Sequence, residues 1–211
     1  MKKPFSPILI ILFLLILSSC GTNYSTSELE SNFTNDQISD LTKIVEFFKG
    51  NVCANKNADL NSCYKQVNHD SMQANGTGIW TKMDFNDQTK LYERISESTF
   101  NEIWMFCEST FYPSKIKAKS LCAVATGKYQ KYLSDLGKTN PRIAKYAERI
   151  EASGDFNGLD LQYQEILNDN NAFDLNNPNI QLILAIHYLS INDQVTRNKD
   201  LIELPKEPKF E

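Results

Sequence analysis

The residue types of a catalytic triad occur side by side in the run Asn68-His69-Asp70-Ser71, and the chain has only one other histidine, His187. Neighbouring residues on a helix point in different directions, whereas triads are assembled from separate segments. We therefore expect no triad at His69, although this histidine is expected to be accessible. An enzyme that uses His69 or His187 as a general base is one alternative for the function.

His187 lies in a segment, 180–191, that is apolar almost all round. A helix with this composition belongs at the centre of a bundle. We expect His187 to be a core residue that is hydrogen-bonded to a backbone carbonyl or a tyrosine.

Trp80 follows the turn sequence Asn75-Gly76-Thr77-Gly78. A tryptophan beside a turn could form a platform for a sugar ring. A small-molecule or glycan-binding module is therefore a second alternative.

The first twenty residues have the pattern of an export signal. Lys2 and Lys3 precede an uncharged apolar run, Ile8 to Leu17, which is followed by two serines and Cys20. The run is shorter than the ~20 residues that a membrane-spanning helix needs, which favours a cleaved signal over an uncleaved anchor. Its ending, Leu-Ser-Ser-Cys, resembles the lipobox of bacterial lipoprotein precursors.

This resemblance implies cleavage before Cys20, with diacylglycerol on the thiol and an acyl chain on the new amino group. Several acyl chains on one residue suffice for stable membrane anchoring. Gly21 stands where an aspartate often retains such proteins in the inner membrane. The resemblance therefore favours the outer membrane of a bacterial cell envelope.

Four cysteines follow the signal: Cys53, Cys63, Cys107 and Cys122. An even number in an exported chain predicts two disulfides, for which three connectivities exist. We favour Cys53–Cys63 and Cys107–Cys122, because each pair closes a short local loop. A metal site of Cys53, Cys63 and His69 is the alternative, but this spacing matches no common zinc pattern. We expect neither a metal nor a cofactor.

The charge of the chain limits its partners. The 211 residues carry a formal net charge of −4, and loss of Lys2 and Lys3 with the signal makes the remainder more acidic. Nucleic acid is not an expected partner, because its phosphates require a basic face. Membrane attachment would depend on the acyl chains and not on attraction to anionic lipids.

Apolar residues at helical spacing recur along most of the chain after residue 35. We expect residues 1–19 to be a signal peptide, 20–35 a lipidated cysteine and flexible tether, 36–192 a helical domain, and 193–211 a polar tail. The predicted helices cover about 36–49, 59–73, 87–96, one from Thr99 through Cys107, 114–136, 141–153, 157–168 and 178–192, with a short ambiguous piece at 79–85.

These patterns predict an all-α protein, a bundle of about six or seven helices with two disulfides. The sequence shows no catalytic constellation, zinc spacing or basic face. The leading hypothesis is a membrane-anchored envelope lipoprotein that binds another protein and is not an enzyme. One form of it is an immunity or inhibitor protein, whose acidic charge would complement a basic partner.

Overall fold

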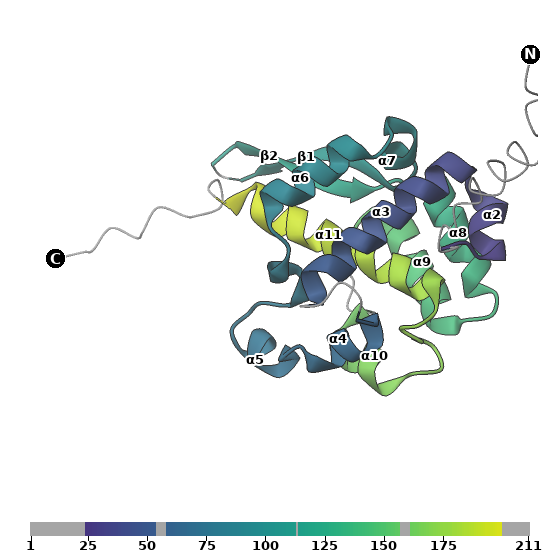
Figure 1. Ribbon diagram of the computed structural model, residues 1–211. Helices are drawn as coiled ribbons and strands as arrows, with labels where there is room; N and C mark the ends of the chain where they lie inside the picture. The colour runs from purple at the N-terminus through teal and green to yellow at the C-terminus, as the bar shows by residue number, and fades with distance from the viewer. Residues whose placement is uncertain (1–23, 54–57, 113, 157–160, 200–211) are drawn as a thin grey trace, which may run out of the picture.

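The computed structural model describes residues 24–53, 58–112, 114–156 and 161–199. Within these ranges the protein is mostly helical, with ten α-helices, one short 3-10 helix and a two-stranded sheet (Figure 1). The helices are α2 (Ser27–Asn32), α3 (Asn35–Val52), α4 (Leu60–Gln66), α5 (His69–Ala74), α6 (Phe85–Arg94), α7 (Glu97–Ile103), α8 (Lys128–Gly137), α9 (Pro141–Ser153), α10 (Tyr163–Asn168) and α11 (Pro178–Arg197); the 3-10 helix is η2 (Ile79–Lys82), and the strands are β1 (Trp104–Phe111) and β2 (Ile116–Ala123).

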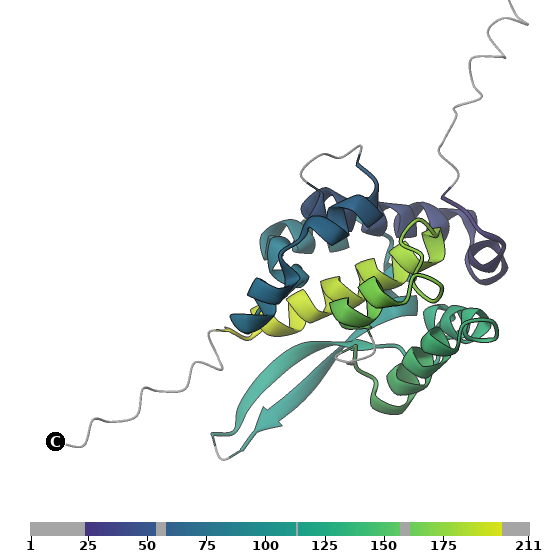
Figure 2. The same ribbon diagram turned by 90° about the horizontal axis from the view of Figure 1, so that it is seen from below.

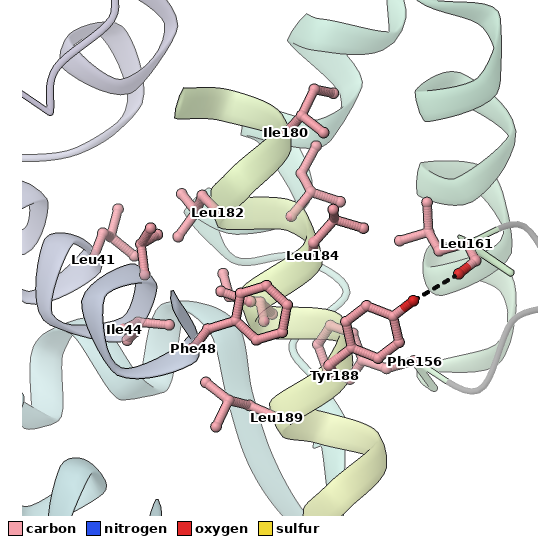
Figure 3. Close-up of a cluster of buried hydrophobic side chains, with 14 of the residues drawn as sticks. Leu41, Ile44, Phe48, Phe156, Leu161, Ile180, Leu182, Leu184, Tyr188 and Leu189 are labelled. Carbon is pink, nitrogen blue, oxygen red and sulfur yellow. Dashed lines mark hydrogen bonds between the residues drawn. The ribbon is translucent and has the colours of Figure 1, made fainter. Parts of the chain in front are cut away.

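Helix α11 runs through the middle of the molecule, and the other elements surround it (Figures 1 and 2). It begins with Pro178 in its first turn and Asn177 as its N-cap. Residues 179–190 are all buried. Helix α3 packs against α11, where the rings of Phe48 and Tyr188 are stacked with centroids 5.7 Å apart (Figure 3). This contact forms the centre of the hydrophobic core.

The expectation of an all-α fold is wrong between residues 104 and 123. Strands β1 and β2 form an antiparallel hairpin here, in which Trp104 pairs with Ala123 and Phe111 with Ile116. The aromatic, serine and threonine residues of β1 suit a strand, and short apolar runs fit both helical and strand periods. The long helix predicted over 114–136 is therefore a strand followed by the shorter helix α8.

The start of α8 is set by a contact with α7. The Glu102 carboxylate accepts a hydrogen bond from the backbone N–H of Lys128 at 2.8 Å. A Cβ atom on Gly127 would lie 2.3 Å from the carbonyl oxygen of Glu102. Only glycine therefore allows the backbone to approach α7 closely enough for this cap.

Both predicted disulfides are present. Cys53–Cys63 joins the end of α3 to α4, and Cys107–Cys122 joins β1 to β2. The bonded residues are 10 and 15 positions apart in the sequence. Each bond restricts the unfolded chain, which typically contributes about 2–4 kcal/mol of stability.

The folded part begins earlier than the sequence predicts. Residues 27–32, which were assigned to the tether, form α2, and the side chain of Leu29 is fully buried. Asn179 of α11 accepts a hydrogen bond from Thr26 and donates one to Glu28. A short polar segment is helical here because it is docked on α11.

The folded part also ends later than predicted. Helix α11 continues beyond Asn192, through residues that were assigned to the tail, as far as Arg197. The side chain of Asp193 is fully buried, and Arg197 donates to both of its carboxylate oxygens at 2.7 Å. A buried carboxylate requires such a partner.

The single helix predicted over 59–73 is divided into α4 and α5. Asp59 caps α4 as expected, accepting from the backbone N–H of Ser62 at 2.9 Å. After Val67 the chain turns, and Asn68 caps α5 by accepting from the backbone N–H of Ser71 at 3.2 Å. The second cap starts a new helix at His69 and so changes the direction of that side chain.

Asp40 of α3 holds the start of α7. Its carboxylate accepts hydrogen bonds from the backbone N–H and hydroxyl of Ser96, from the hydroxyl of Thr99 and from Lys43, all between 2.7 and 2.9 Å. Burial of the carboxyl acts to raise its pKa, but these donors outweigh burial and lower the pKa of Asp40 to about 2.

We expect Asp40→Asn to lower the free energy of unfolding by about 1–3 kcal/mol, because the new amide cannot accept from all these donors. The folded-state pKa of Asp40 is depressed, so its contribution is present above about pH 4 and is lost as the pH falls towards 2. Urea unfolding at about pH 6 and about pH 2.5 measures both effects. If the variant and the parent differ in free energy of unfolding by the same amount at both pH values, this assignment is contradicted.

Candidate functional site

His69 is buried, contrary to the expectation that it is accessible. It is the first residue of α5, and its side chain is only 6% exposed. Its ring stacks on that of Tyr163, with centroids 4.7 Å apart and an interplanar angle of 6°. Its Nε2 atom lies 2.8 Å from the backbone carbonyl oxygen of Tyr64.

These contacts determine the protonation state of His69. Burial lowers its pKa, against the opposing effect of the Tyr64 carbonyl, so the ring is neutral at pH 7. A carbonyl oxygen can only accept, so Nε2 carries the proton and Nδ1 carries a lone pair. Among the described residues no group donates to Nδ1.

His69, Asp70 and Ser71 do not form a triad. The carboxylate of Asp70 accepts a hydrogen bond from the hydroxyl of Tyr163. The backbone of Ser71 is bonded to the Asn68 cap. His69 itself bonds to a backbone carbonyl, so no proton path joins the three side chains.

Trp80 lies on η2, close to His69 in the fold. The six-membered part of its ring is packed directly over Gly78, where a Cβ atom would lie 1.9 Å from the ring carbon Cζ3. The ring is partly exposed. Gly78 therefore fixes where the indole of Trp80 can lie.

A pocket of about 260 Å³ separates η2 and α5 from α10 and the end of α11. Its walls include the rings of His69, Trp80, Tyr163 and Tyr188, with the amides of Gln73 and Gln162. The Tyr188 hydroxyl is bonded to the hydroxyl of Tyr64 at 2.6 Å and donates to the Leu161 carbonyl (Figure 3). Among the residues that the structure describes, no Lys, Arg, Asp or Glu lines this pocket.

His187 contributes to the wall of the same pocket, but it is a core residue, as predicted. Its side chain is 2% exposed, and its Nδ1 atom lies 3.2 Å from the hydroxyl of Tyr146. Complete burial lowers the pKa of His187 to about 3, despite a hydrogen bond with the backbone of Phe156. The structure thus brings both histidines to one pocket in neutral form, with no nucleophile bonded to either.

The cysteines do not form the alternative metal site. Cys53 and Cys63 are bonded to each other, so their sulfurs cannot serve as thiolate ligands beside His69. The part of the chain that the structure describes contains no group of three or more His, Cys, Asp or Glu suited to a metal ion. Cys20, the predicted lipidation site, lies outside the described residues.

The β-hairpin provides a different surface. Its far end projects from the helices (Figure 2). Exposed apolar side chains lie along it: Met105 is 50% exposed, Tyr112 80% and Ile116 38%. Phe106, 39% exposed, is partly covered because Lys119 and Arg197 lie 4.3 and 4.8 Å from its ring centre.

The outer edge of β1 is unpaired beyond its first residue. In the described ranges β1 pairs with no strand other than β2, whereas the other edge of β2 receives the side-chain amides of Gln194 in α11, on the Leu121 carbonyl, and of Asn198, the C-cap of α11, on the Lys119 carbonyl. At the outer edge of β1 the Trp104 N–H donates to the Phe100 carbonyl of α7, and no other backbone hydrogen bond joins this edge to another described residue. In an antiparallel strand about half of the N–H and C=O groups point to this side.

A larger hollow of about 570 Å³ lies between α2, α9 and the start of α11, and several of its polar side chains are paired. Arg142 is bonded to Glu165 and Asp169. Asn140 caps α9 and donates to the Ala172 carbonyl at 2.7 Å. This hollow is therefore a structural junction.

Comparison with known proteins gives no relative. No protein-family model matches the chain, and neither the curated proteins nor the solved structures contain a match. Within the described ranges, none of the helices is both long and apolar enough to span a membrane.

Sequence reasoning identified His69, His187 and Trp80 separately, but missed Tyr163 and Gln162 as their neighbours. No local signal marks these two residues, because they come from α10, about ninety positions after α5. The hairpin could have been recognised from the aromatic and threonine content of residues 104–111.

The low pKa of His187 predicts a specific dependence of stability on pH. The folded protein keeps this ring neutral down to about pH 3, whereas the unfolded chain binds a proton near the ordinary value of about 6.5. The unfolded state therefore gains more protons, and stability falls as the pH is lowered through this window. In NMR titration, the His187 ring should keep its neutral shifts at about pH 5. Titration near pH 6.5 in the folded protein would refute the assignment.

Proposed function

We propose that this protein is a lipid-anchored envelope protein whose domain binds another protein, without catalysis, through the β-hairpin. The observation that carries the proposal is the outer edge of β1 beyond Trp104, which has no backbone partner among the described residues. Such an edge offers a row of backbone donors and acceptors to a strand of a partner.

The composition of β1 favours this use. Proteins usually protect exposed edges with lysine, proline or a covering segment. β1 has eight residues, with Glu108 as its single charged side chain and no proline. An edge of this length can accept several backbone hydrogen bonds from a partner strand.

The side chains on the hairpin would add affinity and specificity. Met105 and Ile116 lie on the same face of the sheet, with the Cys107–Cys122 bond between them. Exposed methionine and isoleucine beside a strand edge can pack against alternate side chains of an added strand. Lys115 is exposed at this end of the hairpin, and Lys117 is paired with Glu108 of β1 at 3.8 Å.

The lipid anchor rests on the lipobox resemblance at Cys20. Helix α2 begins at Ser27, seven positions later. Even a fully extended chain of that length spans at most about 25 Å. The anchor would therefore hold the domain close to the membrane surface, where the outer membrane is the favoured location and the partner is an envelope protein. An immunity or inhibitor role is one form that this binding could take.

Cys20→Ala should abolish lipidation and leave the uncut precursor, because the acyl chains need the thiol. Metabolic labelling with a fatty acid, followed by mass measurement of the purified protein, checks both points. Gly21→Ala is a matched control that keeps the thiol and should be labelled. Normal processing of the Cys20→Ala variant would refute the lipoprotein assignment.

The hairpin is tested with a photoreactive amino acid at Ser109 of β1, in the full-length protein in cells. We expect crosslinking to one recurrent partner. The double variant Met105→Lys, Ile116→Lys should reduce this crosslink about tenfold or more, since two apolar contacts become charged. Val195→Lys is the control, because Val195 is an exposed apolar residue, 55%, outside the hairpin.

Three outcomes would contradict this role of the hairpin. These are no partner, an equal loss of the crosslink in the control, or a crosslink only to a second copy of this chain. Circular dichroism of all variants shows whether the fold is intact, so a loss of binding is not confused with unfolding.

A further inference from the structure

We infer that the pocket of His69, Trp80, Tyr163 and Tyr188 is a binding site for one uncharged sugar ring. The inference is independent of the hairpin, because none of the hairpin residues lines the pocket. Its basis is the chemistry of the walls, taken together with the Nδ1 atom of His69, which has no hydrogen-bond partner among the described residues.

The described residues of the lining include no charged side chain, which limits the class of ligand. A carboxylate, phosphate or ammonium group would enter this pocket without an ion-pair partner. Ligand pockets are mostly apolar, with a few polar groups that fix orientation. An uncharged ligand fits this description.

Aromatic rings make up much of the wall. The ring of Trp80 is packed over Gly78 and is partly exposed, whereas the rings of Tyr163 and His69 are stacked on each other. The faces of aromatic rings carry partial negative charge and attract the slightly positive hydrogens of C–H groups. One face of a pyranose ring presents such hydrogens, whereas its edge carries hydroxyl groups.

The polar groups of the pocket can form hydrogen bonds with the hydroxyl groups of a sugar. Nδ1 of His69 is an acceptor without a partner among the described residues, on a side chain that is 94% buried. A ligand hydroxyl can donate to this atom. The amides of Gln73 and Gln162 lie exposed at the rim and can both donate and accept. A sugar hydroxyl has the same double capacity.

The volume restricts the size of the ligand. At about 260 Å³ the pocket is slightly smaller than the ~300 Å³ at which typical ligand pockets begin. It therefore suits a single ring, free or at the end of a glycan. A long oligosaccharide would extend beyond the aromatic walls.

The test is a titration of the full-length lipidated protein, in a detergent without a sugar headgroup, with glucose, galactose and N-acetylglucosamine. Tryptophan fluorescence and calorimetry measure binding. We expect saturable binding of at least one of these sugars, with a change in the emission of the partly exposed Trp80. Glucuronate and choline, which are charged, should not bind.

Variants identify the site. Trp80→Ala should weaken binding about tenfold, whereas Trp80→Phe should keep most of it, because a phenyl ring still stacks. Gly78→Ala keeps the indole but displaces it, so binding should also weaken. Gln162→Ala should lower the sugar affinity about fivefold or more, because a hydrogen bond is lost. Gln66 is an exposed glutamine outside the pocket, so Gln66→Ala should leave the affinity unchanged.

Several results would overturn the inference. One is that none of the three sugars binds saturably at concentrations up to about 50 mM, because weaker binding would be too weak for recognition. Another is binding of choline but no sugar, which would make the pocket a site for quaternary ammonium groups. A third is unchanged sugar binding by folded Trp80→Ala. The Met105→Lys, Ile116→Lys variant should bind sugar normally, so failure of the hairpin proposal can be distinguished from failure of the sugar-site inference.

Discussion

The burial of residues 179–190 of helix α11 on all sides is the constraint that the rest of the structure satisfies. A buried helix can carry polar side chains only where other elements supply hydrogen-bond partners. Trp104 of β1 donates to Ser190 at 2.8 Å, and Asn192 donates to Gln88 of α6 at 2.8 Å. The same requirement is met at His187 by Tyr146. These bonds fix the rotation of α11 as well as its position.

Helix α11 thereby connects the two surfaces to which we assign functions. Its C-terminal half bonds to β2 through Gln194 and Asn198, so the hairpin is fixed along one edge and open along the other. Tyr188 on the same helix forms a wall of the aromatic pocket. Its N-terminal Asn179 holds α2. One helix thus sets where α2, the strand edge and the pocket lie.

Local interactions were predicted well and long-range ones poorly. The two disulfides join residues close in sequence, and caps such as Asp59 and Asn177 act on the next turn, so both could be read from neighbouring residues. The hairpin was missed because its apolar residues also fit a helical period. The pocket could not be foreseen, since Tyr163 and His69 come together only through packing on α11.

The sequence by itself determined a mostly helical domain with two disulfides, a buried central helix and a core position for His187. These follow from periodicity, capping and cysteine spacing, which act within about twenty residues. Only the tertiary structure decided where strands replace helices, that α2 is folded, and that His69 is buried with one unpartnered nitrogen. These features depend on contacts between segments that are distant in the sequence. The free energy gained by burial in such contacts exceeds the weak helix and strand propensities of the individual residues.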